Sequence, residues 1–92
     1  MDRAIRLTAK AQRQYEKLSV ALRRELARVF AAIGADPEAH TRHFTHGARF
    51  YDGCILAGGK TYYFQVLFGL STNDRAIDIL LIPPPMESTG PH

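Results

Sequence analysis

The apolar residues near the start of the chain recur with the period of an α-helix. Ala11, Tyr15 and Leu18 are three to four residues apart, so they would lie on one side of a helix over residues 9–18. Thr8 precedes this segment, and its hydroxyl can accept a hydrogen bond from a free amide of the first turn. The pattern predicts an amphipathic helix whose apolar side faces a core.

A second helical pattern follows almost without a linker, over residues 20–33. Ser19 can cap its start, and Gly34 suits the left-handed conformation that ends many helices. Its apolar stripe consists of Leu22, Leu26, Val29, Phe30 and Ile33. Because the connection is so short, the two helices are expected to form an antiparallel pair.

After residue 40 the period changes from that of a helix to that of a strand. Alternating apolar positions predict strands over residues 4–7, 48–57, 61–68 and 75–82. Gly58 and Gly59 mark a tight turn, since glycine reaches a positive φ without strain. The fold class is therefore α+β in the order β-α-α-β-β-β: an N-terminal strand, an antiparallel helical hairpin and a three-stranded antiparallel meander.

The helical pair has an apolar side to bury, so it is expected to cover one face of the sheet and leave the other open. In the strand over residues 61–68, the more apolar side is expected to face the helices; it carries Tyr62, Phe64, Val66 and Phe68. Residues 1–85 are expected to form a single domain. Three prolines end the last strand, and residues 86–92 are expected to be a disordered tail.

Composition fits a small globular domain. The chain has 92 residues, of which 46% are hydrophobic and 23% are charged. Its single cysteine, Cys54, excludes an internal disulfide and a multi-cysteine zinc site, and is expected to be a small core residue. We find no apolar run long enough to cross a membrane and no secretory signal, so we expect a cytoplasmic protein without a membrane partner.

Charge is distributed unevenly along the chain. Residues 1–34 carry eight basic and three acidic side chains, whereas residues 35–92 carry four basic and six acidic ones. The basic part could meet nucleic acid or an acidic protein, or it could be a solvated helical surface. Arg23, Arg24 and Arg28 of the second helix are the candidates for nucleic-acid binding.

Three histidines, His40, His43 and His46, recur at every third position. In an extended segment this spacing sends alternate side chains to opposite faces, so we expect no metal site and no cofactor there. They could be solvent-facing loop residues. His43 or His46 could instead carry a proton, since an imidazole titrates near neutral pH.

The strands also supply residues typical of RNA recognition. Arg49 and Tyr51 share one face of their strand, Tyr63 and Gln65 share one face of the next, and Lys60 follows the turn. If the two faces coincide, the side chains form one patch in which rings stack on bases and cations meet phosphates. The same residue types are also common on an exposed sheet without function.

The arrangement resembles the RelE/ParE superfamily of bacterial toxins over residues 4–82. Residues 5–11, Ile-Arg-Leu-Thr-Ala-Lys-Ala, resemble the family's strand followed by a TxxA entry into the first helix. Residues 15–18 and the Leu/Arg-rich second helix, which ends near Asp36-Pro37, resemble its helical hairpin. Three later segments add to the likeness: residues 43–47, 62–68 and 76–82.

The resemblance implies the toxin of a type II toxin–antitoxin pair, which an antitoxin neutralises in a hetero-oligomer. RelE-like members cleave mRNA on the ribosome without a metal, and ParE-like members inhibit DNA gyrase. On the RelE-like interpretation the chain is a ribosome-dependent endoribonuclease with His43, His46 and Arg49 as catalytic residues. RNA would then be bound by Lys60, Tyr51, Tyr63 and Gln65.

The chain departs from the nuclease pattern at two places. The family's Tyr-Arg-Val stretch in the third strand is replaced by residues 61–66, Thr-Tyr-Tyr-Phe-Gln-Val, which contain no arginine. The last strand runs into Ile-Pro-Pro-Pro rather than Gly-His-Arg with a tyrosine beyond it. Loss of one electrostatic group typically costs about 10²–10³ in rate, so the expected function is that of a RelE-like toxin with a degenerate catalytic set. The alternatives are a ParE-like gyrase inhibitor, which the missing arginine supports, and a non-toxic nucleic-acid-binding module.

Overall fold

The computed structural model describes residues 3–45, 47–71 and 75–88. Its elements are β1 (Ile5–Leu7), α1 (Ala9–Glu16), α2 (Val20–Ala35), the 3₁₀ turn η1 (Glu38–His40), β2 (His43–Thr45), β3 (Ala48–Ala57), β4 (Lys60–Leu70), β5 (Ile77–Leu81) and β6 (Met86–Glu87). The predicted α+β class is confirmed. The two helices and the four predicted strands are present, together with the short strands β2 and β6, which the sequence pattern did not indicate.

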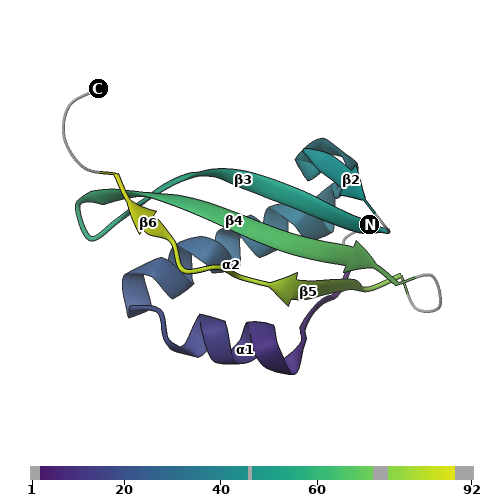
Figure 1. Ribbon diagram of the computed structural model, residues 1–92, viewed down its shortest axis with the longest axis horizontal. Helices are drawn as coiled ribbons and strands as arrows, with labels where there is room; N and C mark the ends of the chain where they lie inside the picture. Colours follow the sequence, from purple (N-terminus) through teal and green to yellow (C-terminus); the bar gives the residue numbers. More distant parts are fainter. Residues whose placement is uncertain (1–2, 46, 72–74, 89–92) are drawn as a thin grey trace.

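The strands form one sheet in the order β1-β5-β4-β3-β2, with β6 paired to β4 (Figure 1). The meander β3-β4-β5 is antiparallel, and β1 runs parallel to β5. Residues 86–87 were expected in a disordered tail, but Met86 pairs with Tyr63 and Glu87 with Tyr62. The prolines therefore interrupt the ladder between β5 and β6 without ending it, and residues 89–92 of the expected tail lie outside the described residues.

Both predicted helix caps are formed. The Thr8 hydroxyl accepts a hydrogen bond from the Ala11 amide at 3.2 Å, and the Ser19 hydroxyl accepts one from the Leu22 amide at 3.2 Å. These bonds satisfy amides that have no partner within the helix. Because Ser19 follows α1 so closely, the chain reverses there; α1 lies below β5, and α2 crosses behind the strands (Figure 1).

Gly34 does not end the second helix, contrary to the sequence prediction. It lies within α2, which continues to Ala35, and it is buried where the chain entering β1 crosses the helix. The Arg3 amide donates to the Gly34 carbonyl at 2.9 Å, and a Cβ atom at Gly34 would lie 2.9 Å from the Arg3 carbonyl oxygen. Glycine is thus needed here for a close approach of two backbone segments.

Gly34→Ala is therefore expected to destabilise the protein by about 1–2 kcal/mol, even though alanine is the better helix former. The added methyl group meets a backbone carbonyl, which can move only if β1 shifts. Urea unfolding measures the change. Gly69→Ala is the matched control, because its Cβ would meet only the Leu80 Cδ1 atom at 3.8 Å; equal losses for both variants would contradict this explanation.

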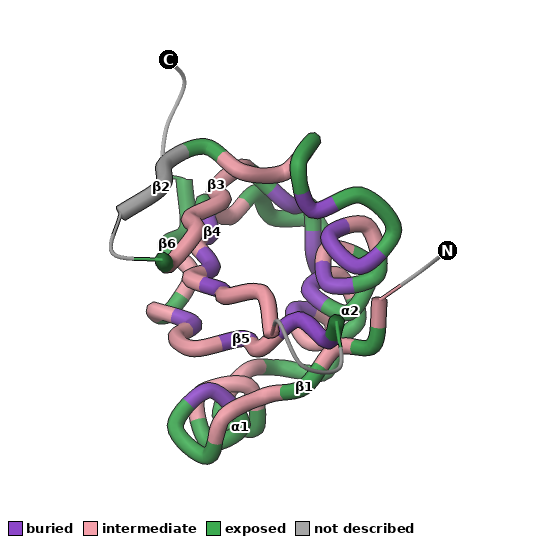
Figure 2. The backbone as a smooth tube through the Cα atoms, turned by 90° about the vertical axis from the view of Figure 1, so that its right-hand side faces the viewer, coloured by how far each residue is buried: buried purple, intermediate pink, exposed green. Residues whose placement is uncertain are grey.

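The hydrophobic core lies between the helices and one face of the sheet. Figure 2 shows α2 facing β3 and β4 across buried residues, with α1 lying below β5 and β1. The fully buried large side chains are Leu26, Ile33, Val66, Phe68, Ile77, Ile79 and Ile82. As predicted, Phe64, Val66 and Phe68 of β4 face the helices. The opposite sheet face carries no helix among the described elements.

Candidate functional site

The open sheet face is formed by alternate residues of β3 and β4. In the register of this hairpin, Asp52 pairs with Gln65 and Cys54 pairs with Tyr63. Directly paired residues of antiparallel strands send their side chains to the same face. Since Phe64 and Val66 face the core, Asp52, Cys54, Tyr63 and Gln65 lie on the open side.

Three of these side chains form a hydrogen-bonded chain across the hairpin. The Tyr63 hydroxyl donates to Asp52 Oδ2, and Gln65 Nε2 donates to the Tyr63 oxygen at 3.2 Å. Arg42 lies at the edge of the sheet, with its Nε atom 3.6 Å from Asp52 Oδ1. The carboxylate of Asp52 therefore already has a phenolic donor and a positive charge beside it.

Apolar side chains surround this polar chain. Leu56 and Met86 are 65% and 68% exposed, and Met86 stands opposite Tyr63 in the register. Towards the other end of the sheet, Leu67 pairs with Leu81. Exposed apolar side chains gathered on one face are typical of a protein interaction site.

Charges on the open face are matched by opposite charges nearby. Arg6 of β1 pairs with Asp78 of β5, with Nε to Oδ1 at 2.9 Å, and Arg42 lies beside Asp52. At the hairpin end, Lys60 and Glu87 share the face of Tyr62 rather than the open one, and Lys60 Nζ is 3.1 Å from Glu87 Oε1. The hydrogen bond and the charge of Glu87 raise the pKa of the Lys60 ammonium. The described part of this face thus lacks the cluster of unpaired cations that a phosphate backbone requires.

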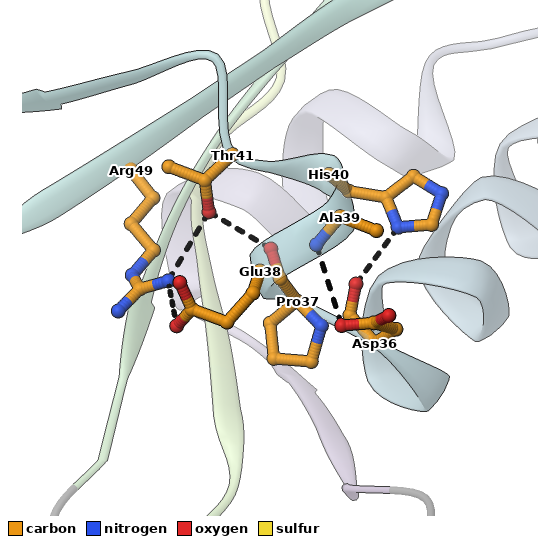
Figure 3. Close-up of polar contacts among 7 residues, drawn as sticks. All are labelled: Asp36, Pro37, Glu38, Ala39, His40, Thr41 and Arg49. Atoms are coloured by element: carbon orange, nitrogen blue, oxygen red, sulfur yellow. Dashed lines mark hydrogen bonds and ion pairs between the residues drawn. The ribbon is translucent and has the colours of Figure 1, made fainter.

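Arg49 is held on the covered side of the sheet (Figure 3). Its Nη1 atom donates to Glu38 Oε1 and to the Thr41 hydroxyl, the latter at 3.2 Å. The Thr41 hydroxyl in turn donates to the Pro37 carbonyl at 2.8 Å. The Arg49 side chain is only 14% exposed, and it ties β3 to the turn η1.

Tyr51 lies beside this network and also faces the core. Its ring meets the edge of the His40 ring at a centroid distance of 5.0 Å and the Phe64 ring at 5.8 Å. His40 Nδ1 is 2.9 Å from the Asp36 carbonyl oxygen, as Figure 3 shows. These contacts make Tyr51 part of the packing between η1 and the sheet.

The RNA-binding patch expected from the sequence is not assembled. Arg49 pairs with Phe68 and Tyr51 pairs with Val66, which places both on the covered face, whereas Tyr63 and Gln65 lie on the open face. Lys60 pairs with Ala57 at the far end of the hairpin. Eight residues of extended strand separate that position from Arg49, about 26 Å, so the two cations cannot hold one phosphate.

The expected proton carriers have different outcomes. His43 lies in β2, and its backbone pairs with Phe50 of β3, the residue after Arg49. The side chain of His43 lies outside the described part of the structure. His46 lies outside the described residues altogether. Both roles remain predictions.

Cys54 was expected in the core but is exposed. The reason is the register, which pairs it with Tyr63 on the open face and leaves its neighbour Ile55 buried. The residues that the sequence did not single out are Arg42, Asp52, Glu38 and Thr41. The contacts of Glu38, Thr41 and Arg42 join segments that no local pattern connects, whereas the position of Asp52 follows from the register of the hairpin.

The described residues contain no group of three or more histidine, cysteine, aspartate or glutamate side chains placed to hold a metal ion. No helix among them is both long and apolar enough to cross a membrane.

Comparison with known proteins gave no match to a family model, to a curated protein or to a solved structure.

Proposed function

We propose that this chain is the toxin of a type II toxin–antitoxin pair and that it acts in the ParE-like way, by docking on a protein target. The β-α-α-β-β-β order with a sheet covered on one side is the arrangement implied by the resemblance of residues 4–82 to that superfamily. The observation that carries the docking mode is the open sheet face, where apolar side chains surround charges that are already paired. The target class that the resemblance offers is DNA gyrase.

The same geometry argues against RNA cleavage as the main activity. A ribonuclease without a metal needs free cations beside the scissile phosphate and a base beside the attacking hydroxyl. Arg49 is engaged by Glu38 and Thr41, and Lys60 is far away at the hairpin end. A docking surface needs neither residue, because its affinity comes from desolvated apolar groups and shape.

Leu56→Asp is the variant that tests docking. Leu56 is 65% exposed, so the substitution is compatible with folding but places a charge in the apolar surface. We expect it to weaken gyrase inhibition in a supercoiling assay at least tenfold, equivalent to about 1.4 kcal/mol of binding. Val20→Asp is the control, because Val20 is 59% exposed on the helical side. Full inhibition by Leu56→Asp, or no inhibition by the wild-type protein, would contradict the proposal.

RelE-like cleavage of mRNA on the ribosome is the second candidate. The observation in its favour is that β2 brings the backbone of His43 beside β3, one register position from Arg49. An assay with translating ribosomes tests it: wild-type cleavage that persists in the His43→Ala, Arg49→Ala double variant eliminates these residues as the catalytic pair. Both candidates require a cognate antitoxin, whose co-expression should relieve growth arrest in the cytoplasm.

A further inference from the structure

A second charged surface lies on the helices, away from the open sheet face. It consists of five exposed basic side chains, which we call the helical basic surface: Lys10, Arg13, Lys17, Arg24 and Arg28. Lys10, Arg13 and Lys17 follow one another at spacings of three and four residues, so they share the outer side of α1 and its C-cap. Arg24 and Arg28 are one turn apart on the outer side of α2.

Among the described residues, most of these cations lack an acidic partner. Within the described ranges, the ion pair of this surface is that of Arg28 with Glu25, at 3.8 Å, and no acidic side chain is paired with the other four. The nearby Glu16 accepts a hydrogen bond from Gln12 at 3.2 Å. This surface therefore differs from the open sheet face, where the charges of the described residues are paired.

The residues between the cations identify the kind of partner. Ala27, Ala31 and Ala35 are also exposed on α2, and Val20 is the one large apolar side chain among the exposed residues of the described helices. A membrane-bound helix needs bulky apolar residues to insert, and a protein interface needs aromatic or aliphatic anchors at its centre. Basic side chains separated by small ones instead allow close approach to a phosphate backbone, to which arginine can donate two hydrogen bonds.

We infer that the helical basic surface binds the phosphodiester backbone of a double-stranded nucleic acid without reading its sequence. The inference does not depend on the proposed toxin function. The open face lies on β3 and β4, and α2 is separated from these strands by the buried layer (Figure 2), so nucleic acid on the helices and a protein target on the sheet could be bound at the same time. The protein would then be concentrated near nucleic acid while its sheet face engages the target.

Salt dependence measures this binding directly. Fluorescence anisotropy with labelled duplex DNA and, in a separate arm, duplex RNA, each of about 20 base pairs and arbitrary sequence, would be recorded from about 50 to 300 mM NaCl. Each phosphate contact contributes roughly 0.9 to the slope of log affinity against log salt for DNA. Four or five contacts between basic side chains and phosphates therefore predict a slope of about −4 for log affinity against log salt concentration. Binding in either arm supports the inference, and the stronger arm identifies the nucleic acid.

The variant Arg24→Gln, Arg28→Gln should lower the magnitude of the slope by about 2 and weaken binding roughly 10- to 60-fold near 100 mM salt. Lys10→Gln, Lys17→Gln is an independent second variant with the same expectation. The charge-matched control is Arg6→Gln, Arg75→Gln, which removes two positive charges outside the helices and should leave the slope unchanged. Absence of binding at the lowest salt, or an equal loss in the control, overturns the inference.

Discussion

Replacing Phe68 by alanine is expected to lower the free energy of unfolding by about 3–5 kcal/mol. Phe68 is fully buried on the central strand β4, between Arg49 of β3 and Ile79 of β5 in the register. Truncation loses the transfer free energy of the ring and leaves a cavity that the neighbouring strands cannot close. A domain of this size has only about 5–15 kcal/mol of stability, so chemical denaturation should show a large shift in midpoint.

Phe50→Ala provides the matched control for this prediction. The substitution is the same, but Phe50 pairs with Leu67 on the open face and remains partly exposed. Its expected loss is less than half that of Phe68→Ala, because less apolar area leaves water there when the chain folds. Equal losses would mean that both faces of the sheet are buried in solution, and the open face would no longer be available as a docking surface.

The local elements of this fold could be predicted from sequence because their causes are local. Thr8 and Ser19 cap helices whose apolar stripes have the helical period, and the alternation around Phe64 and Val66 correctly identified the inner side of β4. The prediction that Gly34 ends the second helix was wrong, because glycine has two structural uses. It can end a helix, or it can allow another segment to pass closely, and the second requires knowledge that Arg3 lies above it.

The candidate site was harder to predict, because the sheet face on which a side chain lies depends on the register between β3 and β4. Shifting one strand by a single residue moves all its side chains to the other face. The tight turn at Gly58 and Gly59 was recognised, and both residues have a positive φ. A two-residue turn pairs Ala57 with Lys60, and counting back from that pair places Tyr51 opposite Val66. The signal that separates Tyr51 from Tyr63 was therefore present in the sequence.

The contacts of Arg49 could not be predicted from the sequence in the same way. Glu38 precedes it by eleven residues and belongs to a turn whose position depends on where α2 ends and β2 begins. An arginine on a strand beside tyrosines is equally compatible with holding phosphate and with holding the protein's own carboxylate. Only the folded arrangement decides between the two, and the low exposure of the Arg49 side chain favours the structural role.

Arg49→Ala is accordingly expected to destabilise the fold by about 2–3 kcal/mol. The substitution removes the charge-assisted bond to Glu38 and the bond to Thr41, together with the packing of the arginine stem on the covered face. Glu38 is 73% exposed, so water screens part of the ion pair, and the expected loss is smaller than for a buried pair. Thermal and urea unfolding measure the change.

Arg42→Ala is the control for this variant, since Arg42 is 58% exposed and its Nε atom is 3.6 Å from Asp52. Its expected loss is below about 1 kcal/mol. Arg49→Lys should be intermediate, because a lysine keeps the charge but cannot reproduce the fork of the guanidinium. If Arg49→Ala instead abolished a ribosomal cleavage activity while the unfolding midpoint stayed unchanged, Arg49 would be a catalytic residue after all, and its contacts with Glu38 and Thr41 would have to open when RNA binds.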